Sequence, residues 1–266
     1  MSTRGDKNRD VEIHRLGGTG VFVKEVEQAV LDGRADIAVH SAKDLPSTTD
    51  AGLVLAAIPE RGDPRDALVG SSLDGLATGS LVATGSVRRR AQLAALRPDL
   101  QFTGLRGNVE TRLQRAPGVD AVVVAVAALD RLGRSAEATE VLEPSVMLPQ
   151  VAQGALAIEC RDGDVETIEI VRAIDDPEAH RCVLAERAFL AELGGACDLP
   201  VGALARLVDG EISITVLLST LDGRAVVRAS ARGSDPQATG RAAAAALLDG
   251  AGGRSLMEVP PSASAR

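Results

Sequence analysis

The chain has 266 residues, of which 45% are hydrophobic and 25% are charged, a globular composition with room for about two or three small domains. Its net charge of -8 argues against a general nucleic-acid binder, and the absence of Trp and Tyr removes the aromatic platform on which single strands stack. No apolar run approaches the ~20 residues that span a membrane. The opening stretch MSTRGDKNRD has no apolar core and is therefore not a secretory signal.

In chain order, residues 1–15 are expected to form a loop. Residues 21–33 predict a helix, because Phe22, Val26 and Ala29 share one face and Gly33 ends the pattern. Strands are expected at 35–41 and 53–58, followed by a polar linker at 59–66.

A second run of strands and helices follows that linker. It has strands at 67–70, 80–85 and 100–107, helices at 86–97 and 108–116, and a continuous buried strand at 120–129. Strands and helices alternate throughout both runs, which predicts parallel sheets covered on both faces. A second linker at 142–154 precedes a strand at 155–161 and a helix at 165–174.

The last part of the chain changes its pattern. Residues 176–195 predict a long helix with Pro177 in its first turn. Three strands separated by Asp-Gly turns and a final helix follow at 203–209, 211–220, 225–233 and 236–252. The fold class is therefore α/β with a small C-terminal α+β domain. The expected domains are 1–60 with 155–174, then 61–150, then 176–259, before a disordered tail at 260–266.

The stretch HSAKDLP (40–46) follows the apolar run ADIAV. Adjacent strand residues point to opposite faces, so Lys43 and Asp44 would not form a simple side-by-side pair. Either the strand has reached the surface there, or its end binds a ligand, as strand ends in open α/β sheets do.

Arginines gather at the starts of helices and the ends of strands. Arg88 and Arg89 lie in the first turn of the helix at 86–97, where the helix dipole disfavours cations. Exposed amides and arginines at such a position make an anion site. Arg106 lies at the next strand end beside Gly107, and Arg131 follows the apolar strand. We interpret Arg88, Arg89 and Arg106 as a site for several carboxylates or phosphates, and the following as solvated charges: Arg90, Arg97 and Arg115.

Three cysteines are widely spaced and form no C-x-x-C pair, so neither a zinc site nor a disulfide framework is expected. Such a chain fits the cytoplasm, with free thiols and no metal. Cys160 and Cys182 fall in an expected strand and helix and should be buried. Cys197 lies on a loop after a helix end, where a thiol is either functional or simply unreactive.

Five stretches then occur in order: VHSAKDLP, ATGSVRRRAQL, LRGNVETRL, QGALAIECR and GACDLPVGA. Over nearly the whole chain they resemble the porphobilinogen deaminase (hydroxymethylbilane synthase) family. The resemblance implies two domains like those of periplasmic binding proteins and a third α+β domain. It implies a cytoplasmic, monomeric transferase of porphyrin and heme biosynthesis, with no nucleic-acid or membrane partner. Such an enzyme joins four porphobilinogen molecules head to tail with loss of ammonia, and hydrolysis releases the linear tetrapyrrole.

The same resemblance implies roles for individual residues. Cys197 would carry a dipyrromethane cofactor through a thioether. Asp44 would be catalytic, because a carboxylate stabilises the cation left when ammonia departs. Contacts to the cofactor are implied for Ser41, Lys43, Thr84, Ser86, Arg88, Arg89, Arg106, Gly107 and Arg112. Contacts on the substrate side are implied for Arg15, Phe22, Arg131, Gln153 and Gly154.

One family feature is missing from this sequence. Members open with a strand and helix containing a pattern like R-x-G-T-R-x-S, so domain one is expected to be N-terminally incomplete, from a misassigned start or in an inactive truncated product. An alternative from another class is a non-catalytic cytosolic solute-binding module for a polycarboxylate ligand. That alternative explains the two lobes and the arginines, but not Asp44 or Cys197.

Overall fold

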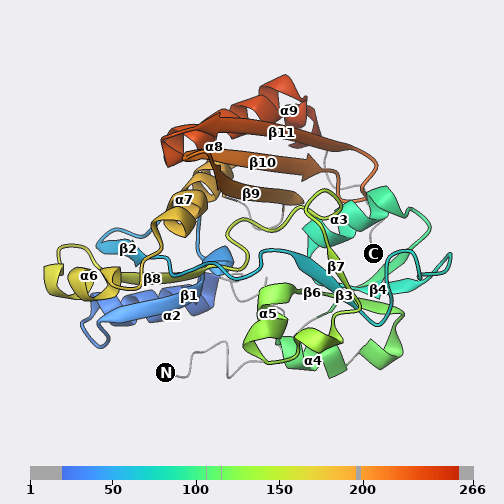
Figure 1. Ribbon diagram of the computed structural model, residues 1–266, viewed down its shortest axis with the longest axis horizontal. Coiled ribbons are helices and arrows are strands. Elements are labelled where there is room, and N and C mark those ends of the chain that lie inside the picture. Colours follow the sequence, from blue (N-terminus) through green and yellow to red (C-terminus); the bar gives the residue numbers. More distant parts are fainter. Residues whose placement is uncertain (1–19, 106, 115, 196–198, 258–266) are drawn as a thin grey trace.

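The computed structural model describes residues 20–105, 107–114, 116–195 and 199–257, and three sheets organise them (Figure 1). The strand orders are β1-β8-β2, β5-β4-β6-β3-β7 and β11-β10-β9. The first two sheets lie at opposite ends of the long axis, and the third lies above them (Figure 1). This arrangement agrees with the expected α/β class with an added α+β unit.

The first sheet consists of β1 (Ile37–Ser41), β8 (Leu156–Arg161) and β2 (Leu53–Ala57), and both outer strands run antiparallel to β8. Leu53 packs with α2 (Gly20–Leu31) and Val54 with α6 (Val165–Arg172), so the two helices cover opposite faces. The expected parallel sheet is wrong here, because β8 arrives from a distant part of the chain and inserts between β1 and β2.

The second sheet contains β3 (Asp66–Val69), β4 (Leu81–Ala83), β5 (Gln101–Thr103), β6 (Ala121–Ala125) and β7 (Glu140–Leu142). The strand β4 runs parallel to β5 and β6, as expected, whereas β3 runs antiparallel to β6 and β7. The helices of this unit are α3 (Val87–Leu96), α4 (Val109–Gln114), η3 (Ala116–Gly118), α5 (Val126–Arg131) and η4 (Ser135–Glu137).

Two expectations about this unit are wrong. The continuous strand at 120–129 ends at Ala125, and α5 begins at Val126. The Val126 amide still donates to the Arg65 carbonyl at 3.0 Å, one pair beyond the last register pair of β3 and β6, but the alanines and leucine that follow favour a helix. No strand was expected just before the linker at 142–154, but β7 forms an edge strand there beside β3.

The third sheet is an antiparallel meander of β9 (Val201–Val208), β10 (Glu211–Ser219) and β11 (Val226–Gly233). The helices α7 (Pro177–Glu192) and α8 (Pro236–Ala245) pack on it, and their Asp176 and Asp235 caps precede a first-turn proline, as the sequence predicts. A π-helical turn η5 (Ala246–Gly250) and α9 (Gly253–Met257) follow. None of the described helices has the length and apolar character needed to cross a bilayer.

Two crossover segments, at about residues 58–65 and 143–155, run between the first two sheets and touch each other. The Gly62 amide donates to the Gly154 carbonyl at 3.3 Å, and Arg61 Nε donates to the Gln153 carbonyl at 2.9 Å. Each crossover therefore constrains the path of the other.

Glu186 on α7 ties both crossovers to the third sheet. Its fully buried carboxylate accepts two bonds from Arg61, at 2.7 and 3.1 Å. It also accepts from the Ala152 amide at 2.6 Å and from the Ala205 amide at 2.8 Å. A buried carboxylate is tolerated when its oxygens are satisfied in this way.

Candidate active site

Lys43 and Asp44 lie in the single 3-10 turn η2 (Ala42–Asp44) that follows β1. The expectation that they alternate along a strand is wrong, because Ser41 makes the last register pair of β1. Pro46 disfavours a helical conformation for the residue before it, so Leu45 is extended and the turn ends. Both side chains therefore leave a tight turn at a strand end.

Arg88 and Arg89 in the first turn of α3 face an internal carboxylate, that of Asp66 at the start of β3. Arg89 donates to Asp66 Oδ1 from Nε at 3.0 Å and from Nη2 at 2.7 Å, and its Nη1 donates to the Val123 carbonyl at 2.9 Å. Arg88 Nη2 lies 2.8 Å from Asp66 Oδ2, and its Nη1 donates to the Leu148 carbonyl at 2.7 Å.

Asp66 is completely buried and was missed in the sequence. Burial opposes its ionisation, but Arg88 and Arg89 outweigh burial and hold the pKa of Asp66 below its usual value. The signal that could have found it is an aspartate inside the apolar strand DALV, since a buried charge needs a partner of opposite sign. The arginine pair is thus partly neutralised by the protein itself.

The hydroxyls before α3 shape its first turn. Ser86 is the N-cap, and its Oγ accepts from the Arg89 amide at 3.4 Å. Thr84 Oγ1 accepts from the Ser86 amide at 3.2 Å. The helix start that we expected to offer exposed amides to an anion is therefore capped in part by its own side chains.

Arg112 reaches the same site from α4. Its Nε donates to the Gly107 carbonyl at 2.9 Å, while Asn108 Oδ1 accepts from the Thr111 amide at 2.9 Å and so starts the helix. Gly107 has φ +103°, and a Cβ there would lie 2.9 Å from the Thr111 side chain, so only glycine fits. Arg106 lies outside the described residues.

The charged groups of η2, α3 and α4 affect one another's pKa values, which indicates that they lie in one site. Burial, and then the charge of Arg89, lower the pKa of Lys43 to about 8, with Asp44 opposing. Burial also raises the pKa of Asp44, against the attraction of Lys43 and Arg112. The Asp44 side chain is nevertheless exposed to solvent.

The remaining residues predicted on the substrate side or at the cofactor lie near the crossovers, at the end of β1 or outside the described part. Arg131 ends α5, and its Nη2 donates to the Gly154 carbonyl at 3.1 Å. Gln153 is fully buried, and Ser41 is half-buried at the end of β1. Arg15, Cys197 and the Phe22 side chain lie outside what the structure describes.

Of the residues that we expected to be solvated charges or buried thiols, most agree with the structure and one does not. Arg90 is exposed, as expected. Arg97 is not a free surface charge, because it donates to the Leu73 and Leu76 carbonyls at 2.9 and 3.0 Å and pairs with Asp99. Cys160 and Cys182 are buried and free, as expected, and Arg115 lies outside the described residues.

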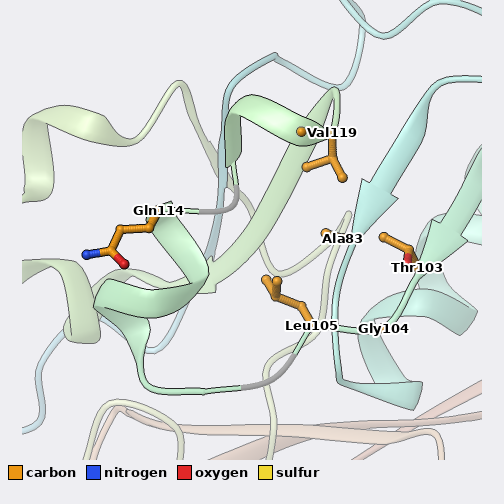
Figure 2. A pocket seen from close by; sticks show the side chains of 7 residues that line it. Ala83, Thr103, Gly104, Leu105, Gln114 and Val119 are labelled. Atoms are coloured by element: carbon orange, nitrogen blue, oxygen red, sulfur yellow. The ribbon is translucent and has the colours of Figure 1, made fainter.

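A pocket of about 440 Å³ lies beside this site, between the carboxyl ends of β4 and β5 and the helix α4 (Figure 2). In the view of Figure 2, Gln114 lies at the left and Ala83 and Thr103 at the right, with Leu105 and Val119 between them. Its lining is Ala83, Thr103, Gly104, Leu105, Gln114, Gly118 and Val119. This lining carries no ionisable side chain, so the pocket does not supply the charges of the anion site.

Comparisons with known proteins cover almost the whole chain. The family model "Porphobilinogen deaminase, dipyromethane cofactor binding domain" matches residues 1–169, and the model "Porphobilinogen deaminase, C-terminal domain" matches residues 180–249. The protein named "Porphobilinogen deaminase" from Roseiflexus castenholzii is 49% identical over 264 residues, which is 97% of this chain and 86% of that protein. The one from Brevibacillus brevis is 44% identical over 263 residues, covering 97% and 85%.

Two solved structures resemble the chain distantly. Protein PG110 from Staphylococcus aureus has a TM-score of 0.37 at 12% identity and covers 60% of this chain and 76% of its own. The periplasmic sulfonate-binding protein SsuA from Methylobacillus flagellatus has a TM-score of 0.33 at 13% identity, covering 62% and 51%. Similarity at this level says nothing about function.

Proposed function

The chain belongs to the porphobilinogen deaminase family, and from that premise we propose how its own residues carry out the family's reaction. It is a hydroxymethylbilane synthase, a transferase of tetrapyrrole and heme biosynthesis. The enzyme condenses porphobilinogen head to tail with loss of ammonia on a dipyrromethane cofactor, and hydrolysis releases the linear product. This membership decides against the non-catalytic solute-binding module.

The cationic side chains suit a ligand that carries several carboxylates. Porphobilinogen and the pyrroles of the cofactor bear acetate and propionate groups. Lys43, Arg88 and Arg112 are the described cations that we assign to these groups. Arg88 supports the assignment, because its Nε is buried and makes no hydrogen bond within the described residues, and its Nη2 holds only the ion pair with Asp66. When bound, the cofactor supplies the pyrrole to which the first substrate is joined, and we assign its thioether to Cys197.

Asp44 is the residue to which we assign catalysis, and its position carries the proposal. It is the solvent-accessible carboxylate among the described charges of the site, whereas Asp66 is sealed beneath the arginines. When ammonia leaves porphobilinogen, positive charge develops on the pyrrole, and a fixed carboxylate beside it lowers the barrier. Because burial raises the pKa of Asp44, the same group is also suited to moving a proton.

We also propose that the three sheets correspond to domains bounded at 1–60 with 155–174, 61–150 and 176–259. The crossovers that touch at Gly62 and Gly154 favour a hinge between the first two. A monomer is proposed because the resemblance to the family implies one. A cytoplasmic location is proposed because the buried free thiols Cys160 and Cys182 suit a reducing compartment.

Asp44→Asn tests the catalytic assignment, since it removes the charge and keeps the shape. Porphobilinogen consumption should fall about 10²–10³-fold, the loss expected for one preorganised electrostatic group. The melting temperature and the mass of the covalent adduct should stay close to wild type. Asp74→Asn, at an exposed site in a surface turn, is the matched control and should consume porphobilinogen normally.

The competing explanation is that Asp44 only caps the turn before Pro46, where asparagine caps about as well as aspartate. Under that explanation Asp44→Asn would keep near-normal consumption. Such a result would remove Asp44 from the mechanism.

A further inference from the structure

The two oxygens of Asp66 have different partners. Oδ1 accepts from Arg89 Nε at 3.0 Å, from Arg89 Nη2 at 2.7 Å and from Gln153 Nε2 at 2.9 Å. Oδ2 faces Arg88 Nη2 at 2.8 Å and accepts no bond of good hydrogen-bond geometry. One oxygen is therefore saturated and the other holds a single ion pair.

The two arginines differ in the same way. All three guanidinium nitrogens of Arg89 donate to the protein, two to Asp66 and one to the Val123 carbonyl. Arg88 donates with Nη1 to the Leu148 carbonyl and holds Asp66 Oδ2 only through the single ion pair of Nη2, while its buried Nε has no hydrogen-bond acceptor among the described residues. Because a buried N–H without an acceptor is costly, Arg88 is the member of the pair that still needs a carboxylate.

We propose that Asp66 is a positioning residue of the carboxylate site: it locks Arg89 in place and competes with the carboxylates of the ligand for Arg88. The proposal rests on the proposed function of Arg88 as a ligand-binding group. Without ligand, Asp66 pairs with both buried arginines. When a carboxylate of the ligand binds, Arg88 leaves Asp66 and pairs with that carboxylate instead.

Gln153 extends this arrangement to the crossovers. Its Nε2 donates to Asp66 Oδ1 and also to the Pro64 carbonyl at 2.7 Å. Asp66 follows the first crossover directly, and Gln153 lies in the second. The saturated oxygen of Asp66 therefore links Arg89 to both crossovers through Gln153, while the other oxygen faces Arg88 alone.

Asp66→Asn separates the two oxygens chemically. With its amide oxygen in place of Oδ1, asparagine can keep the bonds from Arg89 and Gln153. Its amide nitrogen replaces Oδ2 and cannot accept from Arg88. The substitution should release Arg88 and leave Arg89 in place.

The probe is citrate, an unreactive polycarboxylate, titrated calorimetrically into the full chain with the cofactor content of each variant matched by intact mass. Asp66→Asn should bind citrate about tenfold more tightly than wild type, or about 1.4 kcal/mol. The KM for porphobilinogen should fall with it, and kcat should fall because ligand is released more slowly. Asp63→Asn, which breaks a pair with Arg65 in the same crossover, should leave citrate binding unchanged.

A purely structural role for Asp66 predicts the opposite result, namely weaker citrate binding and a lower melting temperature. That result would overturn the proposal. So would an unchanged affinity for citrate in Asp66→Asn, or a failure of both wild type and Asp66→Asn to bind citrate. The added affinity should also vanish in Asp66→Asn combined with Arg88→Gln.

Single arginine variants keep the proposal testable if Asp66→Asn does not fold. Arg88→Gln should weaken citrate binding with a small change in melting temperature, whereas Arg89→Gln should mainly lower the melting temperature. Equal losses of affinity in the two would contradict the proposal. Failure of wild type to consume porphobilinogen would instead count against the proposed function, since citrate binding does not depend on turnover.

Discussion

At the scale of single residues, Lys43 differs from the arginines around it because it can lose its charge near neutral pH. Burial and Arg89 lower its pKa to about 8. Below that pH Lys43 is an ammonium that attracts carboxylates, and above it the attraction is lost. A bound carboxylate favours the charged form and therefore raises the pKa of Lys43. Anion binding at this site should weaken as the pH rises through about 8.

Competitive acetylation followed by mass spectrometry measures this titration directly, because only the neutral amine reacts. The Lys43 reactivity should reach its half-maximum near pH 8 in the absence of ligand, as its lowered pKa requires. Citrate should shift the midpoint upward. Lys24, exposed on α2, is the control within the same molecule. A Lys43 profile that coincides with that of Lys24 would show that the site does not perturb this amine.

The sequence led to Lys43, Asp44 and the arginines because they stand in recognisable motifs at strand ends and helix starts. It did not lead to Asp66, which belongs to no motif. The role of Asp66 depends on its ion pairs with Arg88 and Arg89, which lie about twenty residues later in the chain. Pairings of this kind are set by tertiary structure. For the same reason Arg97 was wrongly interpreted as a solvated charge.

At the scale of elements, the positions of most helices and strands followed from periodicity and from turn residues. The directions of the strands could not be predicted in this way. The strand β8 comes from a segment after the second unit, lies between β1 and β2, and runs antiparallel to both. The boundary between β6 and α5 was also hidden, since the run AVVVAVAAL is apolar whether it is a buried strand or a buried helix.

Gly154 shows how closely the two crossovers approach. Its φ is +90°, and a Cβ would lie 2.6 Å from the Gly62 carbonyl oxygen. Gly154→Ala should therefore destabilise the protein by about 1–3 kcal/mol from overpacking, beyond the cost of the backbone conformation, and should slow turnover. Chemical denaturation and porphobilinogen consumption measure the two effects.

Gly133→Ala is the matched control, since Gly133 also has a positive φ, +66°, but a Cβ there would meet nothing within 4 Å. It should show the backbone cost of roughly 1–2 kcal/mol alone. Equal destabilisation of the two variants would mean that the approach of the crossovers is not tight in solution.

At the scale of the whole molecule, Glu186 joins the third sheet to both crossovers through one buried carboxylate. Glu186→Ala would leave Arg61 and the Ala152 and Ala205 amides without their acceptor. The free energy of unfolding should fall by about 3–5 kcal/mol, the usual cost of breaking a buried ion pair from one side. Glu192→Ala, at an exposed site at the end of the same helix, should change it little. Similar unfolding curves for the two variants would contradict the role assigned to Glu186.

The overall architecture was predicted more fully than the site. Two α/β units and a C-terminal α+β unit follow from the element pattern together with five family motifs, whereas the internal neutralisation of the arginines depends on distances that no motif encodes. The central claim is that this chain builds a linear tetrapyrrole on a cofactor that we assign to Cys197.

Intact-protein mass spectrometry before and after addition of porphobilinogen tests that claim most directly. The account predicts an adduct of two pyrrole units, lost in Cys197→Ser and kept in Cys160→Ser and Cys182→Ser. It also predicts stepwise mass increases, each of one porphobilinogen less ammonia, as substrate is consumed. An unmodified mass that does not change with porphobilinogen, or an adduct that persists in Cys197→Ser, would contradict it.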